Sequence, residues 1–177
     1  FGGFLFEKEN IMQSHLTIRG LTMGLIKTGL IKGSNLSYTT TVTSNGMING
    51  KYVTVLTAQT NQALPTTDAL TGVAFRALAD NQATVIVVGP NAAGEIQMCQ
   101  GGIEDTEVGI TTTAGAFKRA PQFPTLPDDF MVMGYLLART APSASAWTPG
   151  TDNWAATGVT CTEFVQCGVL PSRPQTS

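Results

Sequence analysis

Residues 83–100 read Ala-Thr-Val-Ile-Val-Val-Gly-Pro-Asn-Ala-Ala-Gly-Glu-Ile-Gln-Met-Cys-Gln, and this stretch carries the clearest structural signal in the chain. It opens with a run of mostly β-branched residues, continues with a Gly-, Pro- and Asn-containing stretch, and ends in alternating polar and apolar residues. β-Branched residues favour strands, and Gly, Pro and Asn favour the turns between strands. The stretch therefore predicts a β-hairpin.

The same pattern of short strands and turns continues on both sides of this hairpin. Two Asn-Gly pairs, Asn45-Gly46 and Asn49-Gly50, are typical of two-residue hairpin turns. Seven or more short strands, with turns about every 8–14 residues, are typical of an antiparallel sandwich or barrel. The predicted fold class is all-β: an antiparallel β-sandwich or small jelly-roll-like barrel with an extended N-terminal arm. Further strands are expected at 36–44, 51–60, 130–140 and 159–167.

Residues 1–33 differ in composition from the rest of the chain. The pentapeptide Gly-Leu-Ile-Lys-Thr at 24–28 is nearly repeated as Gly-Leu-Ile-Lys-Gly at 29–33. Each glycine inside a helix costs about 1 kcal/mol relative to alanine, and in a strand the apolar pairs would face both sides. We therefore predict that residues 1–33 form an arm or first strand that packs on a neighbour, that residues 34–170 form the β-sandwich domain, and that residues 171–177 form a C-terminal tail.

The composition narrows the range of possible functions. The chain has 177 residues, 12% of them charged and 42% hydrophobic, with three cysteines and a single histidine, His15. This low charge is typical neither of a disordered chain nor of a coiled coil. Catalytic triads, Cys-His pairs and most zinc sites would all need the same histidine, which lies in the arm, a poor support for precise chemistry. We expect no catalytic residue, no cofactor and no metal site.

The charges are unevenly distributed along the chain. Residues 1–60 carry five cations and two anions, whereas residues 61–177 carry five cations and ten anions. A basic front favours docking on an acidic surface, although counts this small also split unevenly by chance. Nucleic-acid binding by the body is disfavoured because Lys118 and Arg119 are its only adjacent cations. No apolar run reaches the roughly 18 residues that a membrane span needs, so no membrane contact is expected.

Three further groups of residues leave alternatives open. In one extended strand, the Cα atoms of Cys161 and Cys167 would lie roughly 20 Å apart, so a disulfide would need a turn between them, and reduced thiols are favoured. The acidic stretch 104–107 is either a calcium-binding loop or, as we favour, a solvated connection. Trp147 and Trp154 flank a Pro-Gly turn and form either an exposed loop platform for a sugar or partner or, as we favour, a buried plug.

Several segments taken together resemble virion proteins of tailed bacteriophages, and in particular the small β-rich capsid decoration, or cement, proteins. The resemblance covers roughly residues 45–175, rests on the order of the turns and contains no single diagnostic motif. It is carried by Thr84–Val88, Ala93–Gln97 and Gln100-Gly101 of the hairpin, then by Pro121–Asp128, Gly134–Leu137, Trp147–Trp154, Gly158–Thr160 and Leu170–Gln175.

This resemblance implies a structural role without catalysis. Proteins of this kind sit on the outer capsid surface as trimers and clamp neighbouring capsomers, so the expected partners are the major capsid protein and two further copies of this chain. The expected location is the virion, after synthesis in the host cytoplasm. A low-charge surface suits protein contact, because ordering long charged side chains is entropically costly. The candidate partner-contact residues of the arm are Arg19, Leu25, Ile26, Lys27, Leu30, Ile31 and Lys32.

Two other functions compete with this one. The first alternative is a tail-fibre or receptor-binding domain that recognises a host surface glycan through Trp147 and Trp154. The second is a small glycan-cleaving enzyme, which needs a pair of carboxylates that no local pattern singles out. The capsid decoration role remains the favoured hypothesis.

Overall fold

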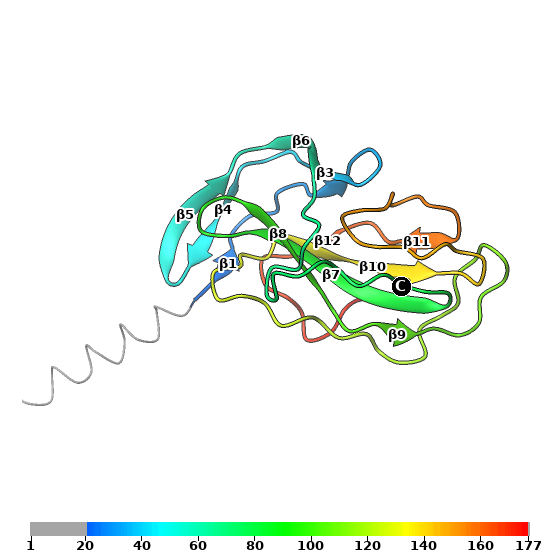
Figure 1. The fold of residues 1–177 in the computed structure, drawn as a ribbon. Coiled ribbons are helices and arrows are strands. Elements are labelled where there is room, and N and C mark those ends of the chain that lie inside the picture. The colour runs from blue at the N-terminus through cyan, green and yellow to red at the C-terminus, as the bar shows by residue number, and fades with distance from the viewer. Residues whose placement is uncertain (1–20, 177) are drawn as a thin grey trace, which may run out of the picture.

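The computed structural model describes residues 21–176, and every regular element in this part of the chain is a β-strand (Figure 1). All strand pairings are antiparallel, so the predicted all-β antiparallel fold class is confirmed. Residues 21–176 contain no helix long and apolar enough to cross a membrane. The twelve strands are β1 (Met23–Gly24), β2 (Ile31–Lys32), β3 (Ser37–Thr40), β4 (Ser44–Ile48), β5 (Lys51–Leu56), β6 (Gln59–Ala63), β7 (Gln82–Pro90), β8 (Ile96–Gln100), β9 (Glu104–Asp105), β10 (Gly134–Thr140), β11 (Val159–Cys161) and β12 (Val165–Gln166).

The central sheet has the strand order β11-β10-β7-β8, with β9 added beside β7 and β12 beside β10. Its β7–β8 pair is the hairpin predicted from residues 83–100, and the two strands meet in register at Pro90 and Ile96. The turn is closed by Asn91, whose side-chain oxygen accepts hydrogen bonds from the backbone amides of Ala93 and Glu95 at 3.0 Å. Asn is favoured in turns because its side chain forms such local bonds.

Alternation along the central strands gives the domain two apolar layers. In β7, Val85 and Val87 face one side of the sheet, whereas Ile86 and Val88 face the other. A sheet that buries both faces needs cover on both, which explains why β7 reads as a nearly continuous β-branched run. Figure 1 shows β3 and β6 above this central sheet, β1, β4 and β5 at its left-hand end, and the C-terminal segment below it.

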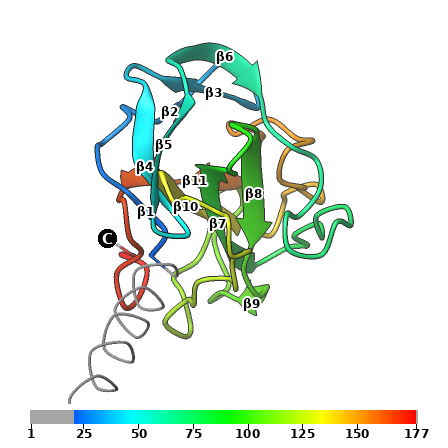
Figure 2. The same cartoon turned by 90° about the vertical axis from the view of Figure 1, so that its left-hand side faces the viewer.

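Different parts of the chain cover the two faces. The Ile86 face packs against residues from the two ends of the sequence, including Leu30, Tyr38, Trp147 and Trp154. The three-stranded sheet of order β2-β3-β6 lies on this side, and the three-stranded sheet of order β1-β4-β5 stands beside the central sheet (Figure 2). The opposite face is covered by irregular segments and the C-terminal tail, which contribute Phe117, Phe123, Leu126, Phe130 and Leu170.

The predicted turn at Asn45-Gly46 is wrong, because these two residues lie inside β4. The hairpin between β4 and β5 turns instead at Asn49-Gly50, where both residues adopt positive φ angles of 51° and 75°. At Gly46 the glycine serves close packing: a Cβ atom there would collide with Met131 Sδ and the Met23 carbonyl oxygen.

The single strand predicted over 159–167 is also incorrect in detail. It divides into β11 and β12, which pair with opposite ends of β10. Between them Phe164 turns inward and its ring meets that of Trp154 edge to face, with centroids 6.2 Å apart. Burial of this aromatic pair breaks the extended run, an effect that alternation alone does not reveal.

Candidate interaction surface

The described part of the predicted arm, residues 21–33, packs on the body of its own chain. β1 pairs with β4, and the Gly24 amide donates a hydrogen bond to the Gly168 carbonyl at 2.9 Å. β2 pairs with β3, so both short strands are edges of sheets in the domain. Contact of this segment with a neighbouring subunit stays a prediction.

Two of the candidate arm residues hold the arm in place. Leu30 is 1% exposed and lies in the core on the Ile86 face of the central sheet. Lys32 reaches across to the end of β11, where its Nζ donates to the Cys161 carbonyl at 2.9 Å and pairs with Glu163 Oε1 at 2.9 Å. The expectation that Leu30 contacts a partner is therefore wrong, because burial in its own core leaves it no free surface.

Four other candidate residues face outward. Leu25 is 49% exposed, Ile26 39% and Ile31 47%, and Lys27 is exposed beside them. With Leu21, which is also exposed, they form what we call the arm face: Leu21, Leu25, Ile26, Lys27 and Ile31. Arg19 and His15 lie outside the described residues. Four large apolar side chains exposed within eleven residues of sequence, Leu21, Leu25, Ile26 and Ile31, make this segment a candidate for protein contact.

The arm face belongs to a basic stretch of the sequence. Residues 21–67 contain Lys27, Lys32 and Lys51 and no Asp or Glu at all. Of these lysines, Lys32 forms an ion pair with Glu163, a residue far along the chain. A positive, partly apolar surface of this kind favours an acidic partner.

The indoles of Trp147 and Trp154 lie in the core, 1% and 5% exposed, so the exposed loop platform is excluded and the buried plug is confirmed. Their rings pack 5.9 Å apart. Each Nε1 is satisfied internally, by the Asn153 carbonyl at 3.0 Å and by the Ser37 carbonyl at 3.1 Å respectively. Neither ring offers a flat face on which a sugar could stack.

The three cysteines are free thiols in the structure. Burial raises the pKa of Cys99 and of Cys161 to about 12 in each case, and it raises the pKa of Cys167 as well. A thiol with so high a pKa holds almost no thiolate at neutral pH and is a poor nucleophile. Within residues 21–176, no three His, Cys, Asp or Glu side chains are grouped to hold a metal ion.

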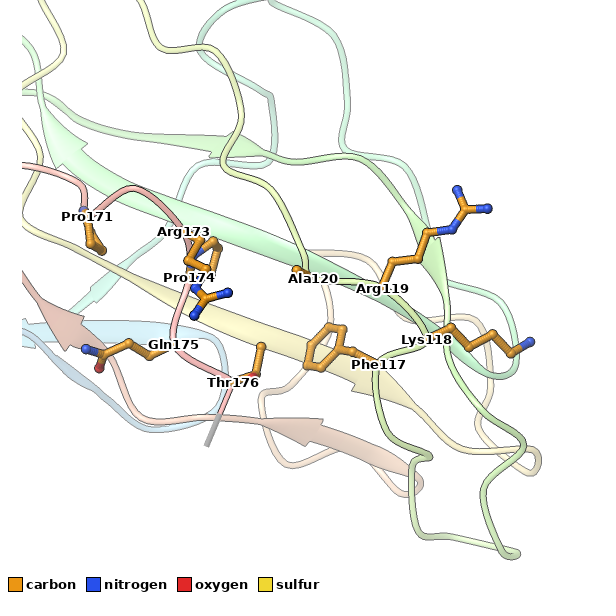
Figure 3. Close-up of a pocket in the computed structure, with 9 residues that line it drawn as sticks. All are labelled: Phe117, Lys118, Arg119, Ala120, Pro171, Arg173, Pro174, Gln175 and Thr176. Atoms are coloured by element: carbon orange, nitrogen blue, oxygen red, sulfur yellow. The ribbon is translucent and has the colours of Figure 1, made fainter.

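A hollow of about 790 Å³ lies on the face of the central sheet opposite β2 and β3, and it adjoins a second hollow of about 350 Å³. Residues 117–123 form one wall and the tail residues 171–176 form the other (Figure 3). We call this the basic groove because its charged lining residues are Lys118, Arg119 and Arg173.

The sequence reasoning missed the basic groove. The adjacent cations Lys118 and Arg119 were the only available signal, and nothing local links them to Arg173. The two walls meet because Phe123 and Leu170 both pack on the same face of the central sheet.

Comparisons of the chain with protein-family models, with curated proteins and with solved structures found no match.

Proposed function

We propose that this protein is a structural virion protein that binds the outer surface of a capsid and stabilises the shell by clamping neighbouring capsomers. The observation that supports this most is the arm face, a set of exposed apolar side chains and one lysine in a segment that β1 and β2 join to the body of the chain. Side chains carried by folded backbone need less ordering when they bind a partner, which lowers the entropic cost of association.

The surroundings of the arm face fit a partner that is itself an acidic protein surface. Lys27 is exposed among these apolar side chains, and residues 21–67 contain no Asp or Glu. From elsewhere in the chain, Asp128 meets Thr22 through its backbone carbonyl, and the Glu163 carboxylate pairs with Lys32. Lys32 therefore acts as an anchor of the segment. A single contact through the arm face is weak. A trimer that engages three such sites at once gains affinity through effective concentration.

Stabilisation of a shell requires no chemistry from the bound protein. A protein that binds the assembled capsid and not its dissociated subunits shifts the equilibrium toward the assembled form by mass action. The buried, high-pKa thiols and the internally bonded indoles are consistent with such a passive role.

The test is cosedimentation of the full chain with empty, expanded capsids. The test variant carries Leu25→Ser, Ile26→Ser and Ile31→Ser, which remove apolar surface from the arm face. A matched control carries Val108→Ser and Ile110→Ser, because these side chains are still more exposed, at 77% and 80%, and lie in the loop after β9. Replacing exposed side chains changes stability little, so both variants should fold.

The proposal predicts that the arm-face variant loses capsid binding and that the control keeps it. Loss of a few exposed apolar contacts of this size lowers the affinity of each site by about tenfold or more. Equal binding by both variants, or no binding of the unmodified protein to capsids, would contradict the proposal.

A further inference from the structure

The basic groove stands out against the charge of the surrounding body. Residues 61–177 carry ten anions and only five cations. Three of these cations, Lys118, Arg119 and Arg173, line the groove, and no Asp or Glu does so. Within residues 21–176 none of the three forms an ion pair. Positive charge is thus concentrated where no carboxylate of the lining neutralises it, and this local field favours an anionic ligand.

Both walls of the groove are fixed to the central sheet. The Arg139 guanidinium lies over the Phe117 ring, 5.4 Å from its centroid, and Arg139 Nη1 donates to the Gly115 carbonyl at 3.0 Å. On the other wall, the backbone amide of Gln175 donates a hydrogen bond to the Tyr135 hydroxyl at 3.0 Å. Because these anchors come from β10, the groove is formed before any ligand arrives.

The form of the walls suits an extended chain. Residues 118–123 and 171–176 contain no regular strand, and the backbone groups of Arg119 and Ala120 form no hydrogen bond with other described residues. Open backbone groups of this kind can pair with an added peptide strand. The groove also offers apolar surface from Phe117, Pro171 and Pro174 between its cations.

Figure 3 shows how the charged side chains are arranged around this space. The Arg173 side chain lies between the two walls, whereas Lys118 and Arg119 extend outward from the opposite wall. A ligand that satisfies all three must therefore carry several negative charges spread along its length. Aspartate and glutamate side chains along an extended peptide supply charges spread in this way, since alternate side chains of a strand point to the same side.

We propose that the basic groove binds an extended acidic segment of a partner protein. This goes beyond the proposed function, because the groove is lined by other residues than those of the arm face and its ligand need not belong to a capsid. A nucleic acid fits less well, because Arg139 lies over the Phe117 ring and the side chain is partly buried against the core, whereas base stacking needs an open aromatic face.

The test measures fluorescence anisotropy of a labelled peptide of alternating glutamate and valine, titrated with the full chain at low salt. A peptide with glutamine in place of each glutamate and a single-stranded thymidine oligonucleotide serve as the other probes. The groove variant carries Lys118→Gln, Arg119→Gln and Arg173→Gln. Its matched control is Arg76→Gln, which removes a cation that lies outside the groove. Circular dichroism checks that each variant is folded.

The proposal predicts saturable binding of the glutamate peptide that weakens as salt is added, with little binding of the glutamine peptide. The groove variant should weaken this binding by about tenfold, since three exposed charge contacts are lost. Arg76→Gln should leave it unchanged. Preference for the oligonucleotide, equal binding of both peptides, or the same loss in Arg76→Gln as in the groove variant would overturn the proposal.

Discussion

Single positions in the interior decide how closely the layers of the fold can approach. Gly46 is such a position, because a Cβ atom there would meet Met131 Sδ, the Met23 carbonyl and the backbone of Gly24. Gly102 is a natural comparison, since the nearest atom to an added Cβ is Glu104 Oε1 at 3.7 Å. The same chemical change, addition of one methyl group, therefore meets a collision at Gly46 and an ordinary van der Waals contact at Gly102.

Gly46→Ala is predicted to lower the free energy of unfolding by about 1–3 kcal/mol, because overpacking forces backbone and side chains apart. Gly102→Ala should change it by no more than about 0.5 kcal/mol. Urea unfolding followed by tryptophan fluorescence measures both, since Trp147 and Trp154 are buried in the native domain. An equal effect of the two substitutions would show that the β1–β4 contact is less tight than the structure has it.

The buried thiols make a prediction about pH. The pKa of Cys161 rises to about 12 on folding, because burial disfavours the thiolate. An unfolded chain loses this proton at about pH 8.5, so stability is unaffected below that pH and falls as the pH rises toward 12. Urea unfolding at about pH 7 and about pH 10 should show this loss, and Cys161→Ala should reduce it. An identical pH dependence in the variant would contradict the assignment.

At the scale of elements, β2 depends on Lys32. Its ammonium group joins the arm segment to β11 through the Cys161 carbonyl and to the following turn through Glu163. The two contacts differ in surroundings, because the Lys32 side chain is 18% exposed and that of Glu163 is 77% exposed. An exposed ion pair contributes little, whereas loss of a donor from a partly buried carbonyl leaves that carbonyl unsatisfied.

Lys32→Met is predicted to cost about 1–3 kcal/mol of stability and to speed hydrogen exchange in β2 and β3. Glu163→Gln removes the ion pair and keeps the carbonyl contact, so its cost should stay below about 1 kcal/mol. Hydrogen exchange followed by mass spectrometry measures both variants. If Glu163→Gln were as damaging as Lys32→Met, the ion pair and not the carbonyl bond would hold β2.

Elements whose formation is local were predictable from the sequence, and those shaped by distant contacts were not. The β7–β8 hairpin follows from a β-branched run and a turn with Asn91, all within one stretch. The break between β11 and β12 arises because Phe164 packs on Trp154, and the position of Gly46 inside β4 reflects Met131. Neither partner lies near enough in sequence to leave a periodic signal.

The candidate surfaces were likewise predictable only where the signal in the sequence was local. The repeated apolar-lysine pattern singled out the arm, and four of its residues are exposed as a contact surface requires. The inward position of Leu30 depends on its place beside the core of the central sheet. The basic groove depends on two segments that meet only in the folded chain, so no sequence motif predicts it.

On the scale of the whole molecule, the two proposed contact surfaces are built from different segments of the chain. The arm face comes from residues 21–31, and the walls of the basic groove come from residues 117–123 and 171–176. We expect the two to act independently, so the groove variant should bind capsids as tightly as the unmodified protein. Cosedimentation of the groove variant checks this, and a loss as large as that of the arm-face variant would show that the surfaces are coupled.

The most direct measurement is an electron cryo-microscopy reconstruction of a complete virion that contains this chain. The account predicts density for the β domain on the outer capsid surface, at the junctions between capsomers, with Leu25, Ile26 and Ile31 turned toward the shell. Density for the domain only at the tail, or its absence from the particle, would contradict the account.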